Sequence, residues 1–383
     1  MQLYVLDTSF IKIAIIDSFQ STLWIDRYNQ PGEFELYMGA DAAFLQFFKI
    51  GNYLIQKDSE HVMVIESVKV ETDTEQGNHF TIKGRSVESF LDRRIIWKQT
   101  DFGNVNLQTA IQRLLNENML SPEISERRIN GIIFESTSDS YINGLKLSAQ
   151  YTGDNLLETI VEICQSFNIG FKMVLNSDNQ FVFSLYSGTD RSYDQTEQTY
   201  VVFSPDFDNI INSNYYEDIT PYKNVTLVAG EGEGPDRLTF AVGTASDLAR
   251  RELFTDARDI SRRKEYEEQE ISDDEWPDKE KPDGDDSEED EFIPIEEYNE
   301  KLKQRGLEKL TETTKEKTFD GKVDSSRMFV YGEDFFIGDI VQIKNEFGIE
   351  GSARVIEYVM SENIEEGLSY YPTFEAIQED AEE

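Results

Sequence analysis

The sequence predicts a multidomain α+β protein, in which two small β-barrels flank an α+β unit and the second barrel carries an acidic and helical insertion. Three observations lead to this prediction. Short alternating or β-branched runs dominate both ends of the chain, and such runs are typical of strands. Apolar residues recur at helical spacing between residues 100 and 190. A long acidic stretch and a charged amphipathic segment interrupt the second group of strands.

The composition is that of a folded and strongly acidic protein. Of 383 residues, 38% are hydrophobic, and 76 Asp and Glu against 36 Lys and Arg give a formal net charge of −40. Proteins that bind duplex DNA or anionic lipid need clustered Lys and Arg, so this charge disfavours both DNA-binding and lipid-binding proteins. No apolar run has the length of a membrane-spanning helix, and no stable membrane association is expected. The N-terminus lacks the basic start and apolar core of a signal peptide, which predicts folding in a cytoplasm.

Residues 1–98 are expected to form the first barrel. Their runs of strand character are separated by Gly, Pro, Asn and Asp: LYVLDTSFIKIAIID, TLWIDRYN, GEFELYM, NYLIQKD, HVMVIESVKVET and HFTIKGRS. Pro31-Gly32 predicts a turn, because proline restricts φ and glycine accepts positive φ. A short helix within residues 40–51 is expected to end at Gly51.

Residues 99–192 are expected to form the α+β unit. Two stretches, NLQTAIQRLLNENML and GDNLLETIVEICQSFNIG, place apolar residues at helical spacing. In the second stretch, Asp154 is positioned to cap the start of the helix and Gly170 to end it. The run FKMVLNSDNQFVFSLY predicts two strands with a hairpin turn from Asn176 to Asn179.

The second barrel is expected to be discontinuous. It consists of residues 193–235 and 322–383, and residues 236–321 form an inserted domain between these parts. Within the insertion, a charged amphipathic helix or helical pair is expected over residues 294–317, with a break at Gly306.

The insertion also contains the acidic stretch EYEEQEISDDEWPDKEKPDGDDSEEDE, residues 265–291. Mutual repulsion of its carboxylates and the presence of helix-breaking prolines predict a solvated loop. The alternative is a calcium site, although the spacing of an EF-hand is not matched.

Parts of the two expected barrels resemble each other. GNYLIQ, from Gly51, and GDIVQI, from Gly338, each open a strand with a turn glycine. Each is followed by a second run, HVMVIESVKVETD or SARVIEYVMSEN, and by a third, HFTIKG or YYPTFEAI. If this similarity is a duplication, three copies of the chain place six similar barrels in one ring. A homotrimer could thereby mate with a six-fold partner by rotational symmetry.

The residue types of common catalytic and metal sites are scarce. Cys164 is the only cysteine, so an intrachain disulfide and a thiolate metal site are excluded, and its apolar-periodic helix predicts a buried position. His61 and His79 are the only histidines and are expected at surface or cross-strand positions. Among so many acidic residues, carboxylate pairs suited to glycoside cleavage arise by chance. We therefore assign no catalytic, cofactor-binding or metal-binding residues.

The segment VAGEGEGPDR, residues 228–237, has glycines at alternate positions after a strand-like run. A dinucleotide fingerprint needs G-x-G-x-x-G, and a P-loop needs Lys and Ser or Thr after its last glycine. Here Pro235 follows the last glycine, and Glu231 and Glu233 would repel a phosphate. The segment therefore predicts a turn that leaves a strand.

Several long segments, in one order along the chain, resemble the baseplate hub proteins of siphophage tails, including the hub portion of prophage tail-associated endopeptidases. The N-terminal segments are TLWIDRYNQPGEFELYM, KIGNYLIQKDSEHVMVIESVKVETD and GRSVESFLDRRIIW. The central ones are QYTGDNLLETIVEICQSFNIGFKM, SGTDRSYDQ, VVFSPDFDNIINSNYYED, VTLVAGEGEGPDR and RRELFTDARDIS, and the last is GEDFFIGDIVQIKNEFGIEGSARVIEYV. The resemblance covers essentially the whole chain.

This resemblance implies a four-part hub with two tube-like β-barrels, assembled as a homotrimer with pseudo-six-fold symmetry beneath a hexamer of the distal tail protein. It also implies contacts with the C-terminal end of the tape-measure protein and with tail fibre or receptor-binding proteins, at the tail tip of the virion. Some relatives continue into a peptidase or lysin domain, whereas this sequence stops at Glu383, so no enzymatic role is expected.

The net charge adds a hypothesis about DNA. A negative lumen would repel phosphates and let DNA pass without specific binding, whereas the acidic stretch could instead dock on a basic partner. Two alternative functions stay open at this point: a tail-associated peptidoglycan hydrolase and a receptor-binding tail module.

Overall fold

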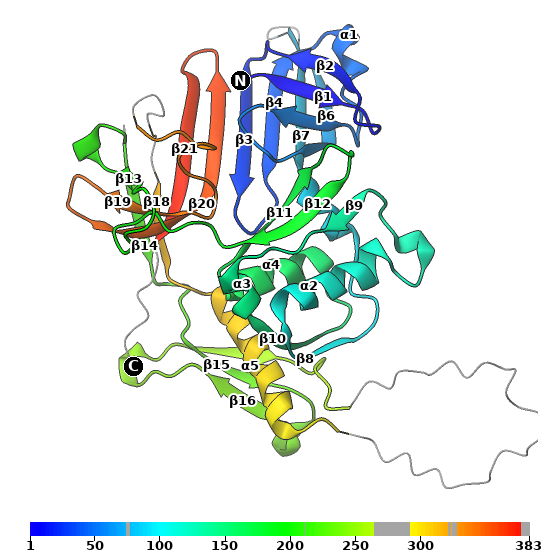
Figure 1. Cartoon of the computed structure of the whole chain (residues 1–383), viewed down its shortest axis with the longest axis vertical. Helices are drawn as coiled ribbons and strands as arrows, with labels where there is room; N and C mark the ends of the chain where they lie inside the picture. The colour runs from blue at the N-terminus through cyan, green and yellow to red at the C-terminus, as the bar shows by residue number, and fades with distance from the viewer. Residues whose placement is uncertain (74–76, 211, 264–291, 321–322, 324–327, 377–383) are drawn as a thin grey trace, which may run out of the picture.

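A computed structural model describes the chain except for residues 74–76, 211, 264–291, 321–322, 324–327 and 377–383 (Figure 1). The protein is a mixed α+β protein, as predicted, with one large sheet and three small ones. The acidic stretch and its expected loop or calcium site lie outside the described residues. Within the described part, no helix has the length and apolar character needed to cross a bilayer.

The N-terminal region is built of antiparallel strands and one short helix. These elements are β1 (Leu3–Leu6), β2 (Lys12–Ile16), β3 (Ser21–Arg27), β4 (Glu33–Gly39), α1 (Ala42–Leu45), β5 (Tyr53–Gln56), β6 (Met63–Asp73) and β7 (Gly77–Ser86). Alternation determines which side chains enter the core: Phe34, Leu36 and Met38 of β4 are buried, and the residues between them are more exposed. Pro31-Gly32 lies in the connection between β3 and β4, as predicted. The positive φ expected at Gly32 is absent, and the glycine instead allows close approach to Ile25 O, which a Cβ atom would meet at 2.2 Å.

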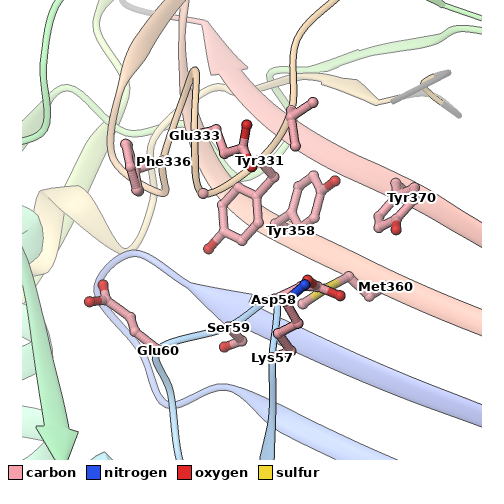
Figure 2. Close-up of a pocket in the computed structure, with 12 residues that line it drawn as sticks. Lys57, Asp58, Ser59, Glu60, Tyr331, Glu333, Phe336, Tyr358, Met360 and Tyr370 are labelled. Atoms are coloured by element: carbon pink, nitrogen blue, oxygen red, sulfur yellow. The ribbon is translucent and has the colours of Figure 1, made fainter. Parts of the chain in front are cut away.

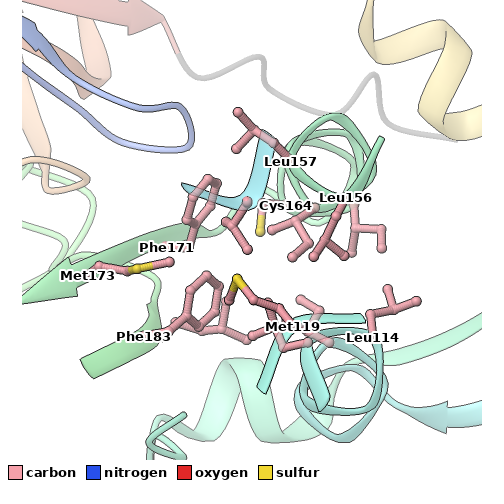
Figure 3. Packing of buried hydrophobic residues seen from close by; sticks show 14 of the residues in the cluster. Leu114, Met119, Leu156, Leu157, Cys164, Phe171, Met173 and Phe183 are labelled. Atoms are coloured by element: carbon pink, nitrogen blue, oxygen red, sulfur yellow. The ribbon is translucent and has the colours of Figure 1, made fainter. Parts of the chain in front are cut away.

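The middle region is a small α+β unit. It contains the 3₁₀ turn η1 (Val87–Arg93), β8 (Thr100–Asn106), α2 (Leu107–Leu115), the π-turn η2 (Asn116–Leu120), the 3₁₀ turn η3 (Ser125–Arg127), β9 (Ile132–Phe134), α3 (Ser140–Gly144), β10 (Lys146–Tyr151), α4 (Leu156–Ser166), β11 (Gly170–Leu175) and β12 (Phe181–Tyr186). The apolar faces of α2 and α4 pack against Phe171 and Phe183 (Figure 3). Cys164 points into this core, as predicted, and burial raises the pKa of its thiol.

The strands of this unit confirm one local prediction and correct another. β11 and β12 pair as a hairpin whose turn contains Asn176 and Asn179, as predicted. The cap of α4 is Asn155, whose side chain accepts hydrogen bonds from the N–H groups of Leu157 and Glu158. The expected cap, Asp154, lies one residue too early and instead accepts a hydrogen bond from Thr152 N. The helix ends at Ser166, and Gly170 begins β11.

A third unit consists of a small sheet covered by the longest helix of the described chain. β15 (Val225–Ala229) pairs with β16 (Thr239–Val242) and β17 (Glu252–Asp256), with the 3₁₀ turns η5 (Gly234–Asp236) and η6 (Asp247–Ala249) between them. Helix α5 (Ile295–Thr311) lies between this sheet and the α4–β10 side of the middle unit (Figure 1). Its polar side chains anchor it there: Lys301 Nζ is 2.5 Å from Asp101 Oδ1, and Tyr151 OH donates to Glu308 Oε1.

The break expected at Gly306 is wrong, because α5 continues through this residue. A Cβ atom at Gly306 would lie 2.7 Å from a methyl group of Val242 and 2.8 Å from one of Val228. The glycine therefore allows close approach of helix to sheet, and packing outweighs its low helix propensity.

The C-terminal strands continue the N-terminal sheet. They are β13 (Val202–Phe203), β14 (Asn214–Asp218), β18 (Glu316–Asp320), β19 (Ile340–Lys344), β20 (Glu350–Asn363) and β21 (Gly367–Ala376), with the 3₁₀ turn η4 (Pro205–Phe207) after β13. β20 pairs antiparallel with β3, so both ends of the chain share one 13-stranded sheet (Figure 1). The closure of each half into a barrel stays a prediction.

The two halves of this sheet repeat one arrangement of strands. The first half has the order β3–β4–β7–β6–β5–β1, and the second has the order β14–β18–β21–β20–β19–β13. The turn glycines noted in the sequence occupy matching places: Gly51 N donates to Ile65 O, and Gly338 N donates to Val355 O. Their φ angles are +91° and +92°. The weak sequence similarity thus corresponds to a repeat in strand order, although β1 pairs antiparallel with β5 whereas β13 pairs parallel with β19.

Candidate functional site

The two halves of the large sheet meet around a pocket of about 460 Å³ (Figure 2). The turn between β5 and β6 supplies Lys57, Asp58, Ser59 and Glu60 on one side. The loop before β19 and the strands β20 and β21 form the other side, with the side chains of Tyr331, Glu333, Phe336, Tyr358, Met360 and Tyr370. The rings of Tyr331 and Tyr358 stack with centroids 3.9 Å apart, so aromatic packing connects the loop to β20.

Asp26, at the end of β3, lies buried beneath this pocket with no exposed surface. Its Oδ1 accepts hydrogen bonds from Trp24 Nε1 and Ser59 Oγ, each at 3.0 Å, and its Oδ2 accepts one from Tyr331 OH at 3.1 Å. Burial raises the pKa of this carboxyl group, while the three hydrogen bonds and nearby His61 oppose the rise. Asp26 therefore ties β3 to both walls of the pocket.

His61 is buried beside this carboxylate, so the expected surface position is wrong. The cross-strand alternative is confirmed, because His61 forms an isolated antiparallel bridge with Val174 of β11. The Nδ1 atom of His61 lies 3.1 Å from Glu88 Oε1, and only 4% of the residue is exposed. Burial by itself would lower the pKa of His61, but the carboxylates of Asp26 and Glu88 outweigh this effect and raise the pKa to about 9. The charged imidazolium in turn lowers the pKa of Glu88 against the effect of burial. At neutral pH the site therefore holds a buried ion pair between His61 and Glu88.

The hydrogen bonds among Ser59, Asp26 and His61 suit a structural role rather than nucleophilic catalysis. The Ser59 hydroxyl donates to Asp26, so it is not presented to His61 as a nucleophile to a base. Glu88 Oε1 also accepts a hydrogen bond from Met173 N at 2.7 Å, which connects the histidine to β11 of the middle unit. In the described part of the chain, no group of three or more His, Cys, Asp or Glu side chains could hold a metal ion.

A second contact connects the two halves of the large sheet to the middle unit. Arg354 Nη1 of β20 donates to Gly338 O at 2.6 Å and to Ser187 O at 2.7 Å, and it lies 3.3 Å from Tyr28 OH. Tyr28 follows β3, and its ring occupies the space that a side chain at Gly338 would need. One guanidinium thus holds the end of each half-sheet and the end of β12 together.

The other residues singled out by the sequence lie away from this pocket. His79, on β7, forms a cross-strand site in line with the prediction: it stacks on Tyr37, and its Nε2 lies 3.0 Å from Gln20 Nε2. The VAGEGEGPDR segment connects β15 to β16 as the predicted turn. Gly230 N donates to Leu238 O and Glu231 N donates to Tyr298 OH, so these two N–H groups already have partners within the protein.

Asp26, Glu88 and Tyr331 are the site residues that sequence reasoning missed. One signal was present for Asp26: it shares a strand face with Trp24, and a carboxylate at an inward-facing position is unusual. Glu88 and Tyr331 gave no such signal, because their turns acquire partners only through tertiary contacts.

In the described structure, several strands of the large sheet pair on one side only: the terminal strands β2 and β13, which pair with β1 and β19, as well as β14 and part of β6. β14 is the last strand of the sheet and pairs with β18. β6 pairs with β7 along its length, but its pairing with β5 is limited to Met63 and Val64.

Three solved structures with this fold are described as tail proteins. The 43 kDa tail protein of prophage MuSo2 from Shewanella oneidensis is 12% identical, with a TM-score of 0.58 over 98% of each chain. The tail protein from Neisseria meningitidis MC58 is 11% identical, with a TM-score of 0.55 over 97% of this chain and 95% of that one. Prophage tail protein gp18 from Listeria monocytogenes EGD-e is 13% identical, with a TM-score of 0.51 over 97% and 94%.

The fold therefore defines the class: it is the fold of prophage tail proteins, shared at identities that establish the fold alone. The family follows from the sequence. The model of the Siphovirus ReqiPepy6 Gp37-like protein family matches residues 2–368, and the chain belongs to this family. No curated protein matches the sequence.

Proposed function

We propose that this protein is a structural hub at the tip of a long, non-contractile phage or phage-like tail. In this role it is a homotrimer that matches the six-fold tail tube and distal tail protein to the proteins of the tip. The observation that carries the proposal is the repeat of one strand order in the two halves of the large sheet. The tail-protein fold and the siphovirus family support the setting.

The repeat provides a way to match symmetries. A chain with two similar halves presents two similar surfaces, so three chains in a ring present six. Closed rings form when a heterologous interface repeats with a rotation that closes. A trimer of this chain can thus meet a hexamer with each half facing one subunit.

The charge of the chain suits a channel for DNA. With a net charge of −40, a ring lined by carboxylates repels phosphates and disfavours binding during passage. The other partners that we propose are the C-terminal end of the tape-measure protein, above the hub, and tail fibre or receptor-binding proteins around it. These assignments rest on the resemblance to siphophage hub proteins.

The test is the mass of the purified chain in solution, measured by light scattering alone and after mixing with the distal tail protein. The proposal predicts a trimer, either alone or on the six-fold partner. A monomer that ignores this partner would overturn it. If that monomer also released new amines or reducing ends from peptidoglycan, the function would be that of a hydrolase. If it adhered to host cells, the function would be that of a receptor-binding module.

A further inference from the structure

A cleft on the surface of the middle unit brings three arginines together. Its volume is about 520 Å³, and its walls come from η1, from the segment between η1 and β8, and from η3 with the residue before it. We call it the arginine cleft, and the residues that define it are Arg93, Arg94, Ile95, Trp97, Ile124 and Arg127. Such a group is unusual in a chain with 76 acidic and only 36 basic residues.

The arginines of the cleft bond to backbone carbonyls and an aromatic ring rather than to carboxylates. Arg94 Nε donates to Arg127 O, and Arg127 Nη2 donates to Ile95 O, each at 2.6 Å. The guanidinium carbon of Arg127 also lies 4.9 Å from the centroid of the Trp97 ring. Within the described part of the chain, none of Arg93, Arg94 and Arg127 forms an ion pair with an acidic side chain.

The two carboxylates that complete the lining, those of Asp92 and Glu126, leave the cleft with an excess of positive charge. Asp92 Oδ2 accepts a hydrogen bond from Arg85 at 3.0 Å, so its charge is already paired outside the cleft. Burial and the nearby charge of Arg94 lower the pKa of Arg127. A bound anion would relieve this repulsion between the two guanidinium groups.

Apolar surface lies between these charges. Trp97 is 55% exposed, Ile95 is 42% exposed and Ile124 is 40% exposed. Guanidinium groups bind carboxylates through charge-assisted hydrogen bonds, and exposed apolar side chains that lie together are typical of surfaces that bind proteins. The cleft therefore matches a peptide segment that combines carboxylates with apolar side chains.

We propose that residues 265–291 of the same chain bind in the arginine cleft. This stretch contains 16 Asp and Glu against Lys279 and Lys281, and it includes Ile271 and Trp276, so its composition matches the cleft. A separate acidic protein would have to approach a chain whose net charge is −40. A segment of the chain itself is already attached, which raises its effective concentration at the cleft. The inference goes beyond the hub function, because it gives the acidic stretch a partner within its own chain.

The described residues that flank the stretch, Arg263 and Phe292, are close enough for this contact. They form an isolated antiparallel bridge with each other. The N–H group two residues before Arg263 donates to Gln150 Oε1 at 2.7 Å, and Gln150 Nε2 donates to Asp101 Oδ1 at 2.7 Å. Asp101 follows Trp97 by four residues. These steps put Trp97 within roughly 35 Å of Arg263, whereas half of the intervening chain extends to about 46 Å.

Cross-linking of the full-length chain tests the contact directly. Arg93 is suited to substitution, because its side chain forms no hydrogen bond or ion pair within the described structure, and Arg93→Lys keeps the charge and adds an amine. A carbodiimide then joins this amine to carboxylates that contact it, and mass spectrometry of the digested protein identifies the partners. Lys146, which is exposed at the start of β10 and outside the cleft, is the internal reference.

The amine at position 93 is expected to join residues 265–291 at least tenfold more often than Lys146 does, in protein that still runs as a monomer on a denaturing gel. Equal yields at the two positions would overturn the proposal. Links that join two chains would also overturn it, because the stretch would then come from a neighbouring copy.

Binding of a free peptide tests whether the cleft is occupied in the parent chain. The probe is a fluorescent synthetic peptide with the sequence of residues 265–291, and the receptor is the chain with those residues replaced by a Gly-Ser linker of equal length. In fluorescence anisotropy the probe is expected to bind this linker variant, with an affinity that falls as NaCl is added. Arg93→Glu in the linker variant should weaken binding at least tenfold. Lys146→Glu, which makes the same change of charge elsewhere, should weaken it less than twofold.

The parent chain should bind the probe at least tenfold more weakly than the linker variant, because its own acidic stretch fills the cleft. Equal binding to the two would show a free cleft that serves a separate acidic partner, and the proposal would fail. No binding to the linker variant, or equal losses in Arg93→Glu and Lys146→Glu, would also contradict it. Thermal unfolding of each variant against the parent verifies that the substituted chains fold.

Discussion

His61 Nδ1 lies 3.1 Å from Glu88 Oε1, and both side chains are buried where three regions of the chain meet. Glu88 belongs to the 3₁₀ turn after β7 and also accepts a hydrogen bond from Met173 N of β11. Asp26 of β3 lies close enough for its charge to raise the pKa of His61. A single imidazolium is thus the electrostatic centre of the junction between the large sheet and the middle unit.

The first prediction concerns pH. The pKa of His61 is about 9 in the folded protein against 6.5 for the free side chain, so folding is favoured by proton binding. This stabilisation is complete below about pH 6.5 and is lost as pH rises to about 9, and linkage puts it at roughly 3 kcal/mol. The unfolding free energy, measured by urea titration between pH 6 and 9.5, should fall across this window.

The variant His61→Gln should be less stable at pH 6 and should show a much flatter dependence over the same window. The chain has one other histidine, so His79→Gln is a matched control and should keep the slope of the parent. A parent protein with constant stability from pH 6.5 to 9 would contradict the assignment, as would a slope that disappears in His79→Gln.

The second prediction uses the repeat as its own control. Gly51 and Gly338 have the same positive φ, but a Cβ at Gly51 meets no atom within 4 Å, whereas one at Gly338 would lie 2.5 Å from the Tyr28 ring. Gly51→Ala should therefore cost about 1 kcal/mol, from backbone strain. Gly338→Ala should cost about 1–3 kcal/mol more, from overpacking. Equal losses in urea unfolding would show that the Tyr28 contact is unimportant.

The third prediction concerns Gly306 in helix α5. Alanine in place of glycine usually stabilises a helix by about 1 kcal/mol, but here the new methyl group would clash with Val228 and Val242. Gly306→Ala should destabilise the protein by about 1–3 kcal/mol. Gly144→Ala, in α3, meets no atom within 4 Å and should be neutral or slightly stabilising in the same thermal or urea assay. A Gly306→Ala protein that is as stable as the parent would refute the close-packing explanation.

The fourth prediction concerns the turn after β15. Tyr298 OH of α5 accepts a hydrogen bond from Glu231 N at 2.7 Å and donates one to Ile260 O at 3.0 Å. Tyr298→Phe leaves both backbone groups without this partner and should cost about 1–3 kcal/mol. Tyr141→Phe is the control, because Tyr141 OH donates to a backbone carbonyl at a half-exposed site, and it should change stability by less than about 1 kcal/mol. Comparable losses in the two variants would contradict this account.

Local structure could be predicted from the sequence wherever residues close along the chain determine it. Alternation in β4, the helical period around Cys164 and the turn at Asn176 each depend on residues close in sequence, and all three were predicted correctly. The α4 cap was misassigned by one residue, since Asp154 and Asn155 are both good caps and only backbone geometry selects between them. The weak likeness of GNYLIQ to GDIVQI was also visible, because equivalent turns select glycine for the same positive φ.

The sequence by itself thus determined the mixed α+β class and the strands at both ends, and it indicated a similarity between the two groups of strands. Only the tertiary structure decided that His61 is buried between Asp26 and Glu88, that α5 runs through Gly306, and that β20 joins β3. The physical reason is the separation along the chain over which each interaction acts. Strand period, turn preference and helix period act over a few residues, whereas the charge on His61 and the pairing of β3 with β20 depend on groups brought together from distant parts of the chain.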